Sequence, residues 1–196
     1  MIVSRREMVK AAGALALAGI SLLGTNVARA DAADEDLINA RFNEIFDKYE
    51  IGDELSAEDA AFVEEHALSA DGGIARGTNT ISGSRTYGGN TYYISGNWYH
   101  NDDTTSAMWH NYGATIQAGC SAVTSPQITV CMRFLAYGFT GSSYELIHKD
   151  EQSDYGTYTK WFTAEFTGGY MGLFAYSNVS CYARIKTSSG SAFVVQ

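Results

Sequence analysis

Residues 128–136 read ITVCMRFLA, and this stretch decides the predicted fold. Its even-numbered residues are apolar, a two-residue period that is typical of a β-strand with one buried face. Residues 158–166 and 179–186 alternate in the same way, except that Lys160 stands at an apolar position. Further strands are expected at 78–87, 91–100, 105–118, 143–149, 172–177 and 191–195.

Glycine, asparagine and serine residues separate these segments. GGN at 88–90, NDD at 101–103 and SSG at 188–190 have the composition of tight turns. Seven to nine short strands at this spacing predict a mainly β domain over residues 74–196. We expect an antiparallel β-sandwich, with a barrel as the alternative.

Residues 31–73 are expected to form an acidic segment of two helices ahead of the strands. Residues 31–70 hold 13 acidic side chains against Arg41 and Lys48. Apolar residues recur at helical spacing at positions 37, 38, 42, 45, 46 and 49. Gly52 ends this pattern, and Ser56 can cap a second helix by accepting a free backbone N–H. Two such helices bury little surface alone, so they must dock or be removed.

The charge of the remaining chain excludes some ligands. Residues 71–196 hold 8 acidic and 7 basic side chains, so the predicted β domain is almost neutral although the whole chain carries −9. Nucleic-acid binding depends on basic patches that neutralise phosphates, and no such patch is present in the sequence. A nucleic-acid partner and a cationic membrane-disrupting activity are therefore not expected.

The first thirty residues have the three parts of a signal peptide. A basic start is followed by an apolar run at 11–23 and by the small-residue site ARA at 28–30. The sequence SRREMVK at 4–10 resembles the twin-arginine (Tat) pattern S-R-R-x-F-L-K, a resemblance confined to the signal. It implies export of a folded protein, with cleavage between Ala30 and Asp31. We expect a secreted bacterial protein without a stable membrane anchor.

Cysteine and histidine positions suggest one disulfide and no metal site. In a secreted protein, Cys120 and Cys131 would pair if a hairpin turned at Ser125-Pro126 between them. Cys181 is expected to be a small buried residue. If a hairpin turned at Asp102-Asp103, His110 would pair near Ser95, about 16 Å along the strand from His100. One ion cannot bridge that distance, so no metal or cofactor is predicted.

Common catalytic motifs are absent from the sequence. It contains no G-x-S-x-G, no H-E-x-x-H and no phosphate-binding glycine loop. A carboxylate pair for glycoside hydrolysis could still come together from Glu145, Glu165, Asp102 and Asp154, but nothing singles out two of them. The sequence therefore leans away from an enzyme without deciding the question.

Aromatic residues cluster within one predicted hairpin, and they supply the candidate ligand site. Rings that stack on sugars and amides that bind hydroxyls suit a glycan-binding platform. With the turn placed at 102–103, Trp98 and Trp109 would be diagonal neighbours on one face across Gly96. The opposite interpretation is that these rings form the core. The candidate ligand-binding residues are Asn97, Trp98, Tyr99, Trp109, Asn111 and Tyr112.

Three functions remain open from the sequence. The leading hypothesis is a non-enzymatic extracellular binding protein for glycans or cell-envelope polymers. A second is a toxin or bacteriocin-like proprotein that is activated when residues 31–70 are removed, because the acidity stops abruptly near Asp71. A third is a hydrolase whose acids or histidine meet only in the fold, which a pocket holding a carboxylate or histidine of shifted pKa would favour.

Overall fold

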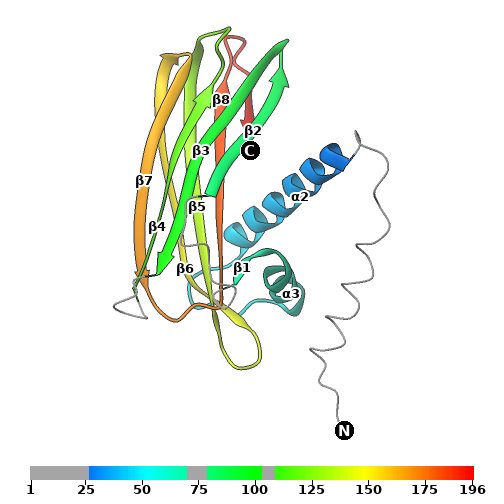
Figure 1. Ribbon diagram of the computed structural model, residues 1–196, viewed down its shortest axis with the longest axis vertical. Coiled ribbons are helices and arrows are strands. Elements are labelled where there is room, and N and C mark those ends of the chain that lie inside the picture. Colours follow the sequence, from blue (N-terminus) through cyan, green and yellow to red (C-terminus); the bar gives the residue numbers. More distant parts are fainter. Residues whose placement is uncertain (1–26, 70–78, 103–108) are drawn as a thin grey trace. The chain divides into compact units, whose positions relative to one another are not determined.

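The structure is a computed structural model that describes residues 27–69, 79–102 and 109–196. The twin-arginine pattern lies outside these residues, and the expected cleavage bond between Ala30 and Asp31 falls in the backbone of helix α2 (Val27–Lys48). Residues Ile38–Gln196 form one compact unit, which is described here by itself. Its strands form two antiparallel sheets in separate layers (Figure 1). The predicted β-sandwich with two preceding helices is confirmed, and the sheets do not close into a barrel.

The four-stranded sheet, sheet B, has the order β2-β3-β4-β7. Its strands are β2 (Asn79–Tyr87), β3 (Asn90–Asp102), β4 (Trp109–Gly119) and β7 (Trp161–Met171). Gly88 and Gly89 join β2 to β3 with positive φ values of 57° and 78°, which favour glycine in this hairpin turn. Along β3 and β4 the even-numbered side chains face the other sheet and the odd-numbered ones face outward.

The second sheet, sheet A, has the order β1-β8-β5-β6, and β9 also pairs with β8. Its strands are β1 (Leu68–Ser69), β5 (Ser125–Phe139), β6 (Tyr144–Thr159), β8 (Tyr176–Lys186) and β9 (Ala192–Val195). The alternation that predicted β5 is present: Ile128, Val130 and Phe134 are fully buried between the sheets. Tyr112 of β4 stacks on Phe134 with ring centroids 3.9 Å apart, which joins the two layers at the core.

The outer side of sheet A is covered by the helical segment. The second part of α2 and helix α3 (Ala57–His66) bury Phe42, Ile45 and Val63 in a separate apolar cluster. Sheet A contributes three residues to this cluster, which are Leu135, Tyr137 and Leu146. We call residues 38–69 the helical cover. At about 25 cal/mol for each Å² of apolar surface removed from water, this burial is what holds two short helices in place.

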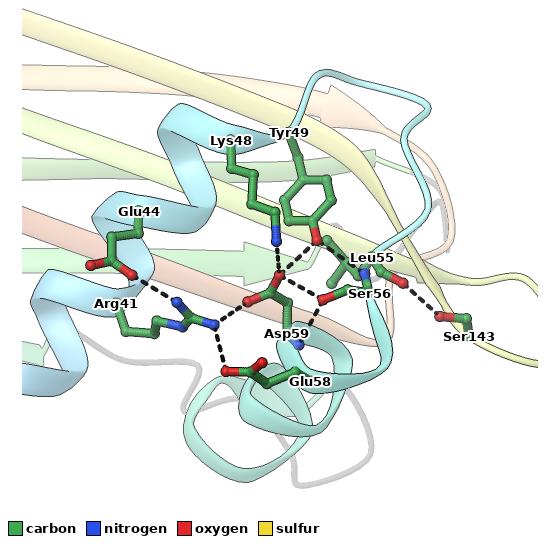
Figure 2. Close-up of polar contacts among 9 residues, drawn as sticks. All are labelled: Arg41, Glu44, Lys48, Tyr49, Leu55, Ser56, Glu58, Asp59 and Ser143. Atoms are coloured by element: carbon green, nitrogen blue, oxygen red, sulfur yellow. Dashed lines mark hydrogen bonds and ion pairs between the residues drawn. The ribbon is translucent and has the colours of Figure 1, made fainter.

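A buried carboxylate joins the two helices of the cover (Figure 2). Asp59, 1% exposed, accepts hydrogen bonds from Arg41 at 2.7 Å, from Lys48 at 2.6 Å and from the Tyr49 hydroxyl at 2.6 Å. The Ser56 hydroxyl donates to the same carboxylate and accepts from the Asp59 backbone N–H at 3.2 Å. The predicted N-cap at Ser56 is thus confirmed, and it forms part of this network.

Two strand predictions were wrong at turns. The alternation at 158–166 was expected to be one strand, but β6 runs through Thr159 and β7 begins at Trp161. Lys160, the exception to the alternation, lies in the turn between them, and Tyr158 beside it has a φ of 50°. Residues 172–175 were expected within a strand at 172–177, but they connect β7 to β8 and leave Leu173 72% exposed.

The predicted Cys120–Cys131 disulfide is not present, and all three cysteines are unbonded. The chain between them passes from β4 in sheet B to β5 in sheet A, so it does not form a hairpin at Pro126. Cys120 packs in the core between the sheets, whereas Cys131 lies on the other side of β5, in reach of Tyr182. Burial raises the pKa of the Cys131 thiol. Cys181 packs against the core together with Val179, but it is partly buried and not fully buried as predicted.

Candidate functional site

The outer face of sheet B has an unusual composition for an exposed surface. Its outward side chains are mostly neutral hydroxyls and amides, and among the described residues of this face only Glu165 is charged. The neutral polar residues are Thr80, Ser82, Ser84 and Thr86 on β2; Thr91, Ser95, Asn97 and Asn101 on β3; Asn111, Thr115 and Gln117 on β4; and Thr163 and Thr167 on β7. We call this surface the B face.

A pair of exposed rings lies at one end of the B face. Tyr93 on β3 and Trp161 on β7 are both paired in register with Gly119 on β4, which lies between them. Their ring centroids are 6.4 Å apart and their planes differ by 23°. Tyr93 is 45% and Trp161 37% exposed. Because glycine has no side chain to separate them, the two rings form a stacked pair across the middle strand.

Two further rings lie over glycines towards the other end of the B face. A Cβ atom built on Gly113 would lie 2.8 Å from the ring of Tyr99, so this ring covers the glycine. A Cβ on Gly169 would lie 3.1 Å from the ring of Trp109. Trp109 is 40% exposed, and its Nε1–H donates to Oδ1 of Asn111 at 3.0 Å. Glycine at both positions leaves room for a flat ring close to the sheet, and at Gly113 also for the carbonyl oxygen of Phe166, which lies closer still to the Cβ position.

The structure divides the predicted ligand-binding residues between the two sides of sheet B. Asn97, Tyr99, Trp109 and Asn111 lie on the B face, but Tyr112 is 1% exposed in the core. The predicted pairing of Trp98 with Trp109 on one face is wrong. Trp98 packs against the core, because even-numbered residues of β3 point inward.

The cause of this error is the register of the β3–β4 pair. It runs out to Asp102–His110, so Asp102 lies in a strand, and the turn predicted at Asp102-Asp103 is wrong. Asp103 itself lies outside the described residues. His100 pairs with Tyr112, and its ring centroid is 6.0 Å from that of His110, much closer than the predicted separation.

Sequence analysis places Tyr93 in the aromatic cluster of the predicted hairpin, but it includes neither Tyr93 nor Trp161 among the candidate ligand-binding residues, although a signal for both is present. Each is a large aromatic residue at the polar phase of an alternating strand: Tyr93 follows buried Tyr92, and Trp161 precedes Phe162, which packs against the core. A ring that points outward from the sheet does not pack in the core. The outward positions of Tyr93 and Trp161 in the alternating pattern could therefore have identified both as candidate ligand-binding residues.

A second polar cluster lies between the two sheets, where Tyr112 is buried and His148 and Asp150 are partly buried. The Tyr112 hydroxyl donates to Oδ2 of Asp150 at 2.7 Å and lies 3.0 Å from Nε2 of His148. Burial lowers the pKa of His148, opposed by the negative charge of Asp150. Burial and Asp150 both raise the pKa of Tyr112. The ring of His148 stacks on Tyr170 at 5.0 Å, so this cluster is packed among aromatic residues.

The two buried histidines, His100 and His110, also have partners. Nδ1 of His100 lies 3.0 Å from the Ser177 hydroxyl, and Nε2 of His110 lies 2.8 Å from the Gly172 carbonyl oxygen. Both rings contact Phe174. Within the described ranges, no group of three or more His, Cys, Asp or Glu residues is arranged to hold a metal ion.

Two small cavities lie away from these clusters. One, of about 160 Å³, is lined by Tyr87, Tyr92 and neutral residues of three loops. The other, of about 210 Å³, lies beside the helical cover and is lined by Arg133, Tyr182 and Arg184 among others. In the second, Arg133 already pairs with Glu151 at 2.6 Å. His148, Tyr112 and Asp150 line neither cavity.

Comparison with known proteins gives no family for this chain: it matches no protein-family model and no curated protein. Of the described helices, neither is both long enough and apolar enough to cross a membrane. The assignment of function therefore rests on the geometry of the B face.

Proposed function

We propose that this protein is a secreted, non-enzymatic binding protein for glycans or cell-envelope polymers, and that it binds them on the B face. The observation that carries the proposal is a set of four rings on a neutral sheet, three of them exposed and one, Tyr99, partly buried. Tyr93, Trp161, Tyr99 and Trp109 lie against glycine positions of the strands, with hydroxyl and amide side chains between them. Secretion is proposed from the twin-arginine pattern and its expected cleavage site.

The chemistry of polysaccharides fits such a surface. A sugar ring presents C–H groups that pack on a flat aromatic ring and hydroxyls that both donate and accept hydrogen bonds. Gln117 already donates to the Thr163 hydroxyl at 3.1 Å across two strands, so these side chains lie close enough to bind one ligand together. Rings held against the sheet lose little conformational freedom on binding, which lowers the cost of association.

The other two functions have less support. Removal of residues 31–70, which the proprotein hypothesis needs, would expose Leu135, Tyr137 and Leu146 of sheet A to water. That packing favours a permanent helical layer. For a hydrolase, the histidine of shifted pKa is His148, which is packed among rings, and the carboxyl of shifted pKa is Asp59, which is held by Arg41 and Lys48 in the helical cover. Neither residue lines a described cavity.

Co-sedimentation of the purified full chain with cell walls and insoluble polysaccharides tests the proposal. The test variant is Tyr93→Ala with Trp161→Ala. The matched control is Tyr155→Ala, which removes a 59% exposed ring from β6 of sheet A. We expect binding by the parent and the control and at least a tenfold loss in the double variant. Failure of the parent to bind any polymer, or full binding by the double variant, would contradict the proposal.

A further inference from the structure

We propose that the ligand of the B face is an uncharged polysaccharide that lies along the strands of sheet B. This inference rests on the proposed function and narrows it to one class of polymer. The charge, the hydrogen-bonding groups and the spacing of rings on the B face each support it.

Charge is the first argument. The described residues of the B face carry one charged group, the exposed carboxylate of Glu165, whose neighbours in register are Thr115 and, one strand further, Asn97. An anionic polymer requires Lys or Arg side chains to replace its counterions, and the described B face has none. The acidic segment and the chain's net charge of −9 would also repel such a polymer. The charge of the B face therefore matches a neutral chain.

Hydrogen-bonding capacity is the second argument. Hydroxyl and amide side chains donate and accept, as sugar hydroxyls do, whereas carboxylates only accept and ammonium groups only donate. The exposed positions between the rings are of this mixed kind, such as Ser95, Gln117 and Thr163 in one row and Asn97 and Thr115 in the next. Such a surface can bind sugar hydroxyls along its whole length, and it does not require a ligand that carries a charge of either sign.

The spacing of the rings is the third argument. The stacked pair of Tyr93 and Trp161 lies in the row of Gly119, and Tyr99 covers Gly113 six residues further along β4. At about 3.3 Å per residue these two places are roughly 20 Å apart. Trp109 lies beyond Tyr99, over Gly169. A ligand that contacts both ends must be an extended chain of several sugars, because a single sugar contacts one place only.

Affinity electrophoresis of the full chain in native gels tests the inference directly. Hydroxyethylcellulose, a soluble (1→3)-β-glucan and galactomannan serve as neutral polymers. Carboxymethylcellulose serves as an anionic polymer on the same backbone as hydroxyethylcellulose. We expect retardation by at least one neutral polymer that persists in 0.5 M salt (about a 4 Å Debye length). We expect no retardation by carboxymethylcellulose.

Variants locate the binding and separate the possible outcomes. Trp161→Ala and Tyr99→Ala, one from each end, should each weaken the retardation at least fivefold, whereas the control Tyr155→Ala should not. Glu165→Lys should add retardation by carboxymethylcellulose, because it replaces the one carboxylate of the described B face with a cation. Circular dichroism and a thermal melt of each variant confirm that it is folded.

Three results would overturn the inference, and they differ in whether the proposed function would fail with it. Salt-sensitive binding to the anionic polymer alone would show that the ligand is charged, while the proposed polymer-binding function would still hold. Equal losses in Tyr155→Ala would place the site elsewhere. No retardation by any polymer, together with self-association that Trp161→Ala abolishes in light scattering, would make the B face a contact between copies of this chain, and the proposed function would fail too.

Discussion

The two sheets present their outer sides to very different surroundings. Sheet A carries Leu135, Tyr137 and Leu146 on its outer side, and the helical cover buries them. Sheet B carries hydroxyls, amides and four rings on its outer side, and neither apolar cluster of the described residues lies on that side. The difference shows how a sandwich separates stability from function: one outer face adds a second core, and the other is left open to a ligand.

The largest effect should come from the covered side. Phe42→Ala removes a ring that is 1% exposed and lies 5.0 Å from the ring of Phe62. We expect a loss of about 3–5 kcal/mol in the free energy of unfolding, because the cavity cannot fully collapse. Chemical denaturation measures this loss. An equal loss of unfolding free energy in Tyr93→Ala would show that the outer side of sheet B contributes as much to stability as the covered side of sheet A.

A smaller effect, dependent on pH, is expected at Asp59. Burial would raise the pKa of this carboxyl, but hydrogen bonds from Lys48, Tyr49 and Ser56 outweigh burial and lower it to about 2, below the ordinary 3.8. A pKa lowered in the folded state stabilises the protein above pH 4, and this stabilisation is lost as the pH falls from 4 to 2. The shift corresponds to roughly 2 kcal/mol.

Asp59→Asn should therefore reduce stability near neutral pH and match the parent near pH 2. Urea denaturation of both proteins at several pH values measures the closing gap. Glu44→Gln is the matched control, because Glu44 also bonds to Arg41 but its side chain is 65% exposed. A gap that stayed constant with pH would show that the network acts through packing alone.

A weaker pH dependence is expected between the two sheets, at His148. Burial lowers the pKa of this histidine, with Asp150 opposing the shift, while Tyr112, Phe134 and Tyr170 pack around it without charge. The neutral form thus stabilises the fold above pH 6.5, and the stabilisation is lost as the pH falls below that value.

His148→Gln keeps a hydrogen-bonding side chain near Tyr112 and removes this titration. The drop in urea midpoint between pH 7 and pH 5 should be smaller in this variant than in the parent. An identical drop in the parent and in His148→Gln would assign the pH dependence to other groups.

The smallest stability effect is expected on the B face, where a ring that binds a ligand should add little to the stability of the fold. Trp161→Ala removes a partly exposed ring from an edge strand and should cost less than about 1 kcal/mol. A thermal melt measures this loss. If the same variant loses polymer binding, the ring acts on a ligand; a loss of several kcal/mol would instead make it part of the fold.

Local patterns predicted the elements well and their pairing poorly. The alternation at Ile128–Ala136 and the cap at Ser56 depend on neighbouring residues, so the sequence contains the full signal. The turn after Asp102 and the passage of the chain between sheets before Ser125 depend on distant contacts. Both errors concerned which residues face each other, and they misplaced Trp98 and the disulfide. A shift of register moves side chains to the opposite face, so a site prediction is sensitive to it.

The segment between the two helices has one more consequence. Gly52 and Leu55 donate backbone hydrogen bonds to Leu146 and Tyr144 of β6, and Leu146 donates one back to Asp53. An edge strand with free backbone groups is a template on which other chains add strands and aggregate. The bonds from residues 52–55 pair the backbone groups at this end of β6, so another chain cannot bond to them. Loss of this short connection should therefore promote fibrous aggregation even where the sandwich itself still folds.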